Sequence, residues 1–172
     1  MNKTRQLVLT AMFIALGVVL PQAFHAIPNA GSIFLPMHIP VLISGFVVGP
    51  LFGLITGLAT PLLSHLIFGM PPVPVLPSML CELAVYGLMT GLLNKLIKIE
   101  NPYLKTCTVL VLSMLCGRLT YGVLNALVFK AGSYSMQAWT SAAFVTAIPG
   151  IIIQLVLIPI LVGRLKKAGY ID

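Results

Sequence analysis

Two charged side chains, Glu82 and Arg118, interrupt apolar stretches of the chain that are each long enough to cross a lipid bilayer. A charge at that depth is costly, so it normally faces a cavity or a partner. Arg118 could hold a carboxylate or another oxyanion through a forked pair of charge-assisted hydrogen bonds. It could equally form an ion pair with Glu82 that joins two helices. The residues leave both roles open for Arg118 and favour the structural role for Glu82.

Further polar residues recur at helical spacing beside these two charges. Tyr121 and Asn125 follow Arg118 at i+3 and i+7, on one helical face, and Tyr86 follows Glu82 by one turn. His38 and His65 stand near the ends of apolar stretches, where hydrogen bonding at the interface is favoured over metal ligation. The predicted polar cluster comprises His38, Ser64, His65, Glu82, Tyr86, Arg118, Tyr121 and Asn125.

No catalytic or metal-binding signature accompanies this cluster. The sequence has no GxSxG, HExxH or P-loop motif and no pair of carboxylates inside the apolar stretches. Cys81, Cys107 and Cys116 lie in apolar stretches without CxxC or Cys/His spacing, which favours buried thiols. We therefore expect neither an enzyme nor a bound cofactor or metal.

Composition identifies the setting in which these residues act. Of 172 residues, 59% are apolar and 8% charged, with a mean hydropathy of +1.07, against roughly 45–50% apolar and 25% charged in soluble domains. Such a chain could not cover a water-facing surface, which excludes a secreted domain, a nucleic-acid binder and a cytoplasmic enzyme. Its length allows about five to seven spans. We expect one transmembrane domain over residues 1–172.

The number of spans follows from where the basic residues fall. The 33–68 stretch is too long for one span and has Pro50, a residue suited to a helix start, at its centre. Cytoplasmic loops collect Lys and Arg. The sequence has three groups of basic residues, and they share one side of the membrane only if an even number of spans separates them. Splitting the 33–68 stretch into two spans puts four spans between the first two groups. The groups are Lys3/Arg5, Lys95/Lys98/Lys105 and Arg164/Lys166/Lys167.

The predicted fold is therefore all-α, a polytopic membrane protein of six transmembrane helices with both termini in the cytoplasm. The polar cluster then maps to the outer half of the bundle, and the inner half is poor in polar groups. This asymmetry favours a pocket open to the outside over a pore or proton relay. Trp139, at the outer start of the last helix, is expected at the headgroup level. The predicted helices cover about 6–24, 33–48, 51–68, 77–95, 106–129 and 138–163.

Small residues mark faces where helices can approach closely. Glycines recur every four residues from Gly45 to Gly57 and again at Gly87 and Gly91. Close backbone approach at such positions drives helix association in lipid. Packing within the chain is favoured over docking of another membrane protein.

These features together resemble a known family, the substrate-binding S components of energy-coupling factor (ECF) transporters. The resemblance covers essentially the whole chain and includes the Ala-x-x-x-Ala of Ala11 and Ala15. The vitamin-binding branch it most resembles is the pantothenate type. The segments that carry this likeness are Leu35-Pro36-Met37-His38-Ile39-Pro40-Val41-Leu42, Gly49-Pro50, Gly69-Met70-Pro71-Pro72 and Gly117-Arg118-Leu119-Thr120-Tyr121-Gly122.

The resemblance implies a binding subunit without an energy source of its own, in the cytoplasmic membrane of a prokaryote. It would capture a vitamin from outside and associate with a transmembrane coupling protein and two ATPase subunits. Ala11 and Ala15 would contact the coupling protein. The first outer loop, with Asn29, and the proline-rich loop 69–77 would close over the ligand.

Several alternatives remain open. The ligand could be a nicotinate-, folate-, pyridoxine- or thiamine-type vitamin instead of pantothenate. A self-contained small transporter or channel is disfavoured by the apolar inner half. A structural subunit without a ligand would leave Arg118 and the asymmetric polar cluster unexplained.

Overall fold

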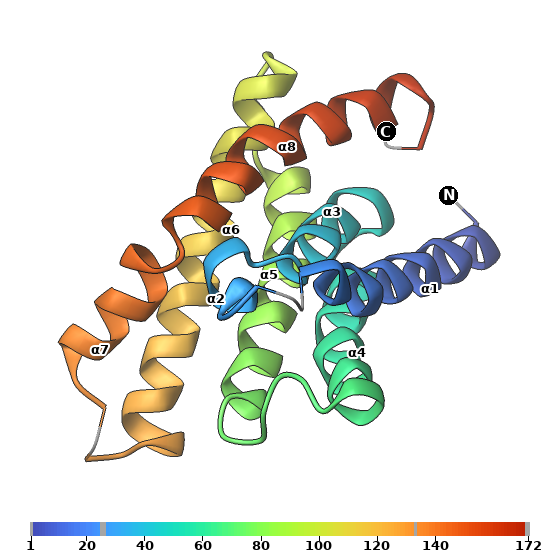
Figure 1. Cartoon of the computed structure of the whole chain (residues 1–172). Coiled ribbons are helices and arrows are strands. Elements are labelled where there is room, and N and C mark those ends of the chain that lie inside the picture. Colours follow the sequence, from blue (N-terminus) through green and yellow to red (C-terminus); the bar gives the residue numbers. More distant parts are fainter. Residues whose placement is uncertain (1, 25–26, 133, 171–172) are drawn as a thin grey trace.

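The chain folds into helices connected by short loops. The computed structural model describes residues 2–24, 27–132 and 134–170, and this part of the chain contains no strand (Figure 1). It contains six helical segments that are long and apolar enough to cross a membrane. The predicted all-α fold with six spans is confirmed. The candidate spans are Lys3–Phe24, Ala30–Val48, Pro50–Phe68, Leu76–Leu96, Pro102–Phe129 and Ile148–Lys167.

The predicted division of the 33–68 stretch is also confirmed. Helix α3 (His38–Val48) ends at Gly49, and α4 (Pro50–Phe68) begins directly after it. Gly49 has φ 86°, a conformation that side-chain-bearing residues rarely adopt, and Pro50 occupies the first helical turn, where its missing N–H costs nothing. A glycine followed by a proline therefore turns the chain between two spans.

The second predicted helix, 33–48, is wrong as a continuous helix. The chain forms a short α2 (Ala30–Phe34), leaves the helical path and starts again in α3. Leu35 takes a left-handed conformation with φ 51°, and Pro36 follows it. Because a residue before proline is pushed out of the right-handed helical region, the break falls here. His38 begins the next helix, its backbone N–H donating to the Leu35 carbonyl.

The last predicted helix, 138–163, is also interrupted. Residues 136–145 form α7 (Met136–Thr140) and a π-helical turn, η3 (Ser141–Val145), and the last candidate span is α8 (Ile148–Lys167). Pro149 lies in the first turn of α8, where proline is tolerated.

The other helices differ from the predictions mainly at their ends. Helix α1 covers Lys3–Val19 and continues as a 3-10 turn, η1 (Leu20–Phe24). Helix α5 (Leu76–Leu96) matches its prediction within one residue at each end. Helix α6 (Pro102–Leu124) begins four residues earlier than predicted, capped by the Asn101 side chain, and ends in a π-helical turn, η2 (Asn125–Phe129).

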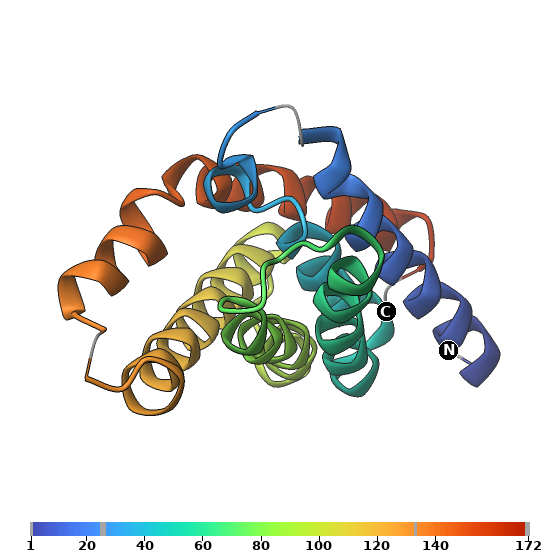
Figure 2. The ribbon, with the colours of Figure 1, turned by 60° about the horizontal axis from the view of Figure 1, so that its bottom comes forward.

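Helix α5 lies between α4 and α6 in both views of the bundle (Figures 1 and 2). The repeated glycines make this packing possible. A side chain at Gly53 or Gly87 would collide with the backbone of the other, and one at Gly57 would collide with the Leu83 carbonyl. The glycines therefore pack helices within the chain, as the favoured interpretation predicted.

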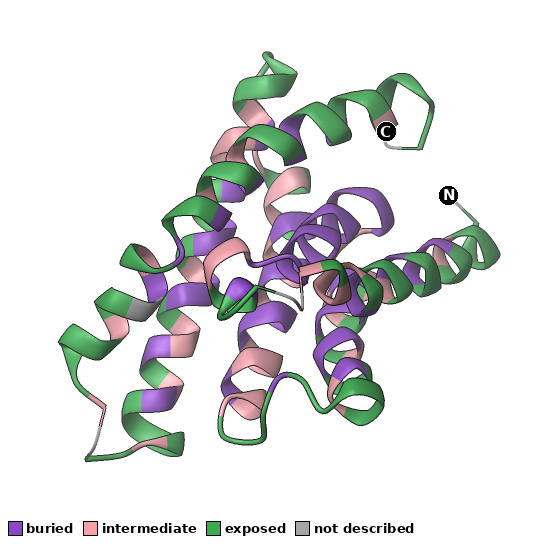
Figure 3. Ribbon diagram, viewed as in Figure 1, coloured by how far each residue is buried: buried purple, intermediate pink, exposed green. Residues whose placement is uncertain are grey.

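Helix α3 is the most enclosed element, buried along its whole length (Figure 3). It contacts α1, α4, α5 and α8. Leu42, in its middle, belongs to an apolar core with Leu83 of α5 and Leu110 of α6, all fully buried. This core fills the centre of the bundle.

Both chain ends meet at one end of the bundle. Arg5 donates to the Gly169 carbonyl at 3.3 Å, and its guanidinium lies over the Tyr170 ring at 4.9 Å. A cavity of about 450 Å³ there is also lined by Gly49, by Lys95 in the last turn of α5 and by Lys105 in the first turn of α6. The three basic groups thus meet around one end, as the count of crossings required.

Labelling from either side of the membrane tests which side this end faces. In a background without Cys81, Cys107 and Cys116, we expect Pro50→Cys to react with a membrane-impermeant thiol reagent only from the cytoplasmic side. Asn29→Cys and Val73→Cys should react from outside. Asn29 precedes the span that ends at Val48, and Val73 follows the span that begins at Pro50, so both lie one crossing away from position 50. Labelling of position 50 from outside would reverse the predicted orientation.

Candidate functional site

A cavity of about 570 Å³ lies between the connection of the first two spans and the connection of the third and fourth. Its wall is formed by residues within 21–24 and 27–38, by Ser64 near the end of α4 and by residues of the 70–75 connection. Glu82 of α5, with Arg118 and Tyr121 of α6, complete it. The cavity volume lies within the range of about 300–1,000 Å³ that is usual for small-molecule sites.

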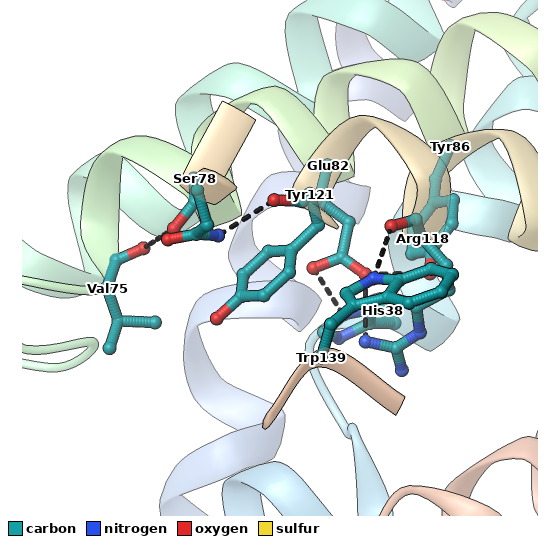
Figure 4. Close-up of polar contacts among 9 residues, drawn as sticks. His38, Val75, Ser78, Glu82, Tyr86, Arg118, Tyr121 and Trp139 are labelled. Atoms are coloured by element: carbon teal, nitrogen blue, oxygen red, sulfur yellow. Dashed lines mark hydrogen bonds and ion pairs between the residues drawn. The ribbon is translucent and has the colours of Figure 1, made fainter. Parts of the chain in front are cut away.

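An ion pair between Glu82 and Arg118 joins α5 to α6 at this cavity (Figure 4). Arg118 Nη1 lies 2.9 Å from Glu82 Oε1, and the Tyr86 hydroxyl donates to the same oxygen at 2.9 Å. The two charged side chains are only 8% and 3% exposed. The pairing that the sequence left open is therefore present, and Tyr86 supports it from one turn along α5.

His38 brings a third span to the pair. Its Nε2 lies 4.0 Å from Glu82 Oε2, too far for a hydrogen bond, and its ring packs on Tyr86 with 5.5 Å between centroids. Neither ring nitrogen has a hydrogen-bond partner among the described residues. Because α3 starts afresh at His38 after the break at Leu35, the break determines where this imidazole enters the site.

The ion pair uses only part of the Arg118 guanidinium. Nε and Nη2 are buried and have no hydrogen-bond partner within the described part of the chain. These two nitrogens form the side edge of the planar group, whose parallel N–H bonds match the two oxygens of a carboxylate. A buried donor without an acceptor costs about 1–3 kcal/mol. These two nitrogens therefore need an acceptor from outside the described residues, either a water molecule or a bound ligand.

Of the residues predicted for the site or the polar cluster, six line the cavity: Asn29, His38, Ser64, Glu82, Arg118 and Tyr121. Tyr86 lies behind the ion pair, and His65 and Asn125 are not part of the wall.

Asn125 does not reach the cavity, although it shares a helix with Arg118. Its amide donates to the Tyr121 carbonyl at 2.8 Å, at the point where α6 passes into η2. Its side chain therefore serves its own helix.

His65 also stays outside the cavity wall. Its Nδ1 lies 2.8 Å from the Pro71 carbonyl and so ties the end of α4 to the connection that covers the cavity. In the predicted first outer loop, residues 25–26 lie outside the described residues.

Trp139, which is expected at the headgroup level, also contacts α6 at Arg118, a contact that the sequence analysis did not predict. Its Nε1–H donates to the Arg118 carbonyl at 3.1 Å, and the ring occupies space that Gly122 leaves open on α6 (Figure 4). The glycine at 122 was the only sequence signal for this contact. Trp139 therefore ties α7 to the turn of α6 that carries Arg118.

The described residues contain no group of three His, Cys, Asp or Glu side chains placed to hold a metal ion. The residues that line the cavity are suited to non-covalent recognition, because they include Arg118, His38 and Tyr121 together with apolar side chains such as Met37 and Met79. The site can bind and orient a small molecule with an acceptor group.

Comparison with known proteins agrees with this chemistry. The family model described as "ECF transporter, substrate-specific component" matches residues 5–162. No curated protein and no solved structure matches the chain.

The ion pair makes a prediction about stability. Arg118→Ala leaves Glu82 buried without its partner, which should lower the free energy of unfolding by about 3–5 kcal/mol. Glu82→Gln combined with Arg118→Ala buries no charge and should recover much of that loss. Thermal unfolding in detergent measures both. An Arg118→Ala variant as stable as the wild type would contradict a structural role for the pair.

Proposed function

The chain belongs to the substrate-specific component family of ECF transporters, and on that premise we propose that it captures a carboxylate-bearing vitamin with high affinity from outside the cell. Members of this family are multi-pass membrane subunits that bind a small-molecule substrate and work with the components of an ECF module; they are not enzymes. The observation that carries the proposal is that Arg118, whose buried Nε and Nη2 have no hydrogen-bond partner in the described part of the chain, lines a cavity of about 570 Å³.

The shape and lining of the cavity support a small, partly apolar substrate. Met37, Val75 and Met79 offer apolar contact, and Arg118 in the same wall has two donor nitrogens without a hydrogen-bond partner among the described residues. Few polar groups in a mostly apolar wall are typical of sites that orient one ligand. A carboxylate at Arg118 with an apolar body against the methionines fits this distribution.

Pantothenate is the first candidate, because the chain most resembles the pantothenate-type branch and pantothenate carries one carboxylate. Nicotinate and folate also carry carboxylates and remain candidates for the same donors. Pyridoxine and thiamine lack a carboxylate, so the free edge of Arg118 favours them less.

Titration calorimetry with these five vitamins tests the proposal, and Arg118→Lys sharpens it. Lysine keeps the charge that faces Glu82 but lacks the planar pair of donors. We expect one carboxylate vitamin to bind the wild type and to bind Arg118→Lys about 10- to 100-fold more weakly, the loss of one charge-assisted contact. Equal affinity in both proteins, or binding of pyridoxine or thiamine alone, would contradict the carboxylate assignment.

The proposed delivery step requires a surface for the transmembrane coupling protein, whose two ATPase subunits supply the energy. Ala11 and Ala15 are exposed on α1, whereas Leu9 and Phe13 face the interior. Two small residues one turn apart permit close approach of a partner helix in lipid. This supports α1 as the docking helix, on a surface away from the cavity wall.

Replacing both alanines separates binding from uptake. With Ala11→Leu and Ala15→Leu, the isolated protein should bind its vitamin normally, because neither side chain lines the cavity. Complex formation and ATP-driven uptake should fail, because leucine holds the partner backbone away. Ala126→Leu, at another exposed alanine, is the matched control and should support uptake. Normal uptake by the double variant would exclude α1 as the docking helix.

A further inference from the structure

The charges at the cavity already balance before a substrate binds. Glu82 and Arg118 form one ion pair, and no other Asp, Glu, Lys or Arg among the described residues lines the cavity. Both side chains are almost completely buried. The empty site is therefore electrically neutral at its centre.

A carboxylate on the free edge of Arg118 would disturb this balance. Arg118 would then face two carboxylates, the substrate's and that of Glu82, and the site would carry one uncompensated negative charge. Buried charges of that kind are strongly disfavoured unless a partner neutralises them. High affinity for an anion therefore requires one more positive charge beside the pair.

His38 is the group placed to supply that charge. It is 3% exposed, both ring nitrogens lack hydrogen-bond partners, and Nε2 lies 4.0 Å from Glu82 Oε2. That oxygen accepts neither the Tyr86 hydroxyl nor Arg118 Nη1, since both use Oε1. A proton on Nε2 would lie beside Glu82 Oε2, a carboxylate oxygen 4.0 Å from the ring nitrogen.

The other titratable groups around Glu82 are less suited to this role. The Tyr86 hydroxyl on α5 already donates to Glu82, and Tyr121 on α6 and Tyr134 beyond η2 are phenols that keep their protons at neutral pH. His65 on α4 faces the Pro71 carbonyl and does not line the cavity. Histidine is also the side chain that ordinarily changes charge near neutral pH.

We propose that the substrate carboxylate binds together with one proton, which His38 and Glu82 hold between them. The proton comes from solvent, His38 Nε2 accepts it, and the resulting N–H donates toward Glu82 Oε2. The site then holds two positive and two negative charges and stays neutral. This inference rests on the proposed carboxylate substrate, and it makes His38 a determinant of specificity for anions.

Calorimetry in buffers of different ionisation enthalpy counts the protons. Pantothenate, nicotinate and folate are the probes, each titrated in phosphate and in Tris at neutral pH. For the carboxylate that binds, we expect the observed enthalpy to change with buffer as uptake of about one proton requires. By linkage, the affinity should then fall about tenfold for each unit by which the pH rises, over the pH range in which binding takes up one full proton.

Two variants and a matched control locate the proton. In Glu82→Gln the substrate carboxylate alone balances Arg118, so binding should persist with no proton uptake and little pH dependence. His38→Gln should lose the uptake and bind the anion more weakly. His65→Gln removes the other histidine within the described part of the chain and should keep an uptake near one proton. If Glu82→Gln does not fold, the wild type and His38→Gln still decide the question.

Two outcomes would overturn the inference in distinguishable ways. Carboxylate binding to the wild type without proton uptake would exclude the proton and leave the proposed function standing. Failure of all three carboxylates to bind would remove the proposed substrate class and the proton uptake with it.

Discussion

The ion pair between Glu82 and Arg118 is the contact on which the arrangement of the site depends. Neither charge is tolerable alone among apolar helices, so α5 and α6 must pack with these two residues side by side. Glycines allow the helices to approach closely enough for this pairing. Gly53 and Gly87 bring α4 against α5, and Gly117 of α6 leaves the space that the Tyr86 ring fills as it reaches Glu82. Close backbone packing thus allows a buried charge pair at this depth.

The interruptions in the helices bring other groups to the same pair. The break at Leu35 and Pro36 turns residues 27–37 into a wall of the cavity and lets α3 begin at His38. The break before α8 leaves α7 free to place Trp139 against the backbone of Arg118. Irregular backbone at membrane depth is tolerated where it is buried in protein or lines a cavity. Here it does both around one guanidinium.

Hydropathy and charge counting predicted the parts of the fold that depend on composition. The six spans, the turn at Pro50 and the gathering of basic residues at one end follow from the length of apolar stretches and from crossing parity. Helix continuity does not follow, because an apolar stretch stays apolar across the break at Leu35. For the site, periodicity placed Arg118 and Tyr121 on one face correctly. It could not show that Asn125 turns to its own backbone, or that Trp139 reaches across from another segment, since both depend on tertiary geometry.

The position of the cavity bears on why such a subunit needs partners. The cavity lined by Arg118 and the cavity lined by Arg5, Lys95 and Lys105 lie at different ends of α3, which has every residue buried. Between them lies the apolar core of Leu42, Leu83 and Leu110, each fully buried. Packed interiors have few voids larger than a water molecule, so a vitamin cannot cross this core while the helices keep their contacts. On the proposed function, a substrate bound at Arg118 reaches the other side only if the bundle moves as a whole or its helices separate, and both motions need work from outside this chain. The exposed small-residue face on α1 offers a partner that supplies this work a contact surface remote from the Glu82–Arg118 pair.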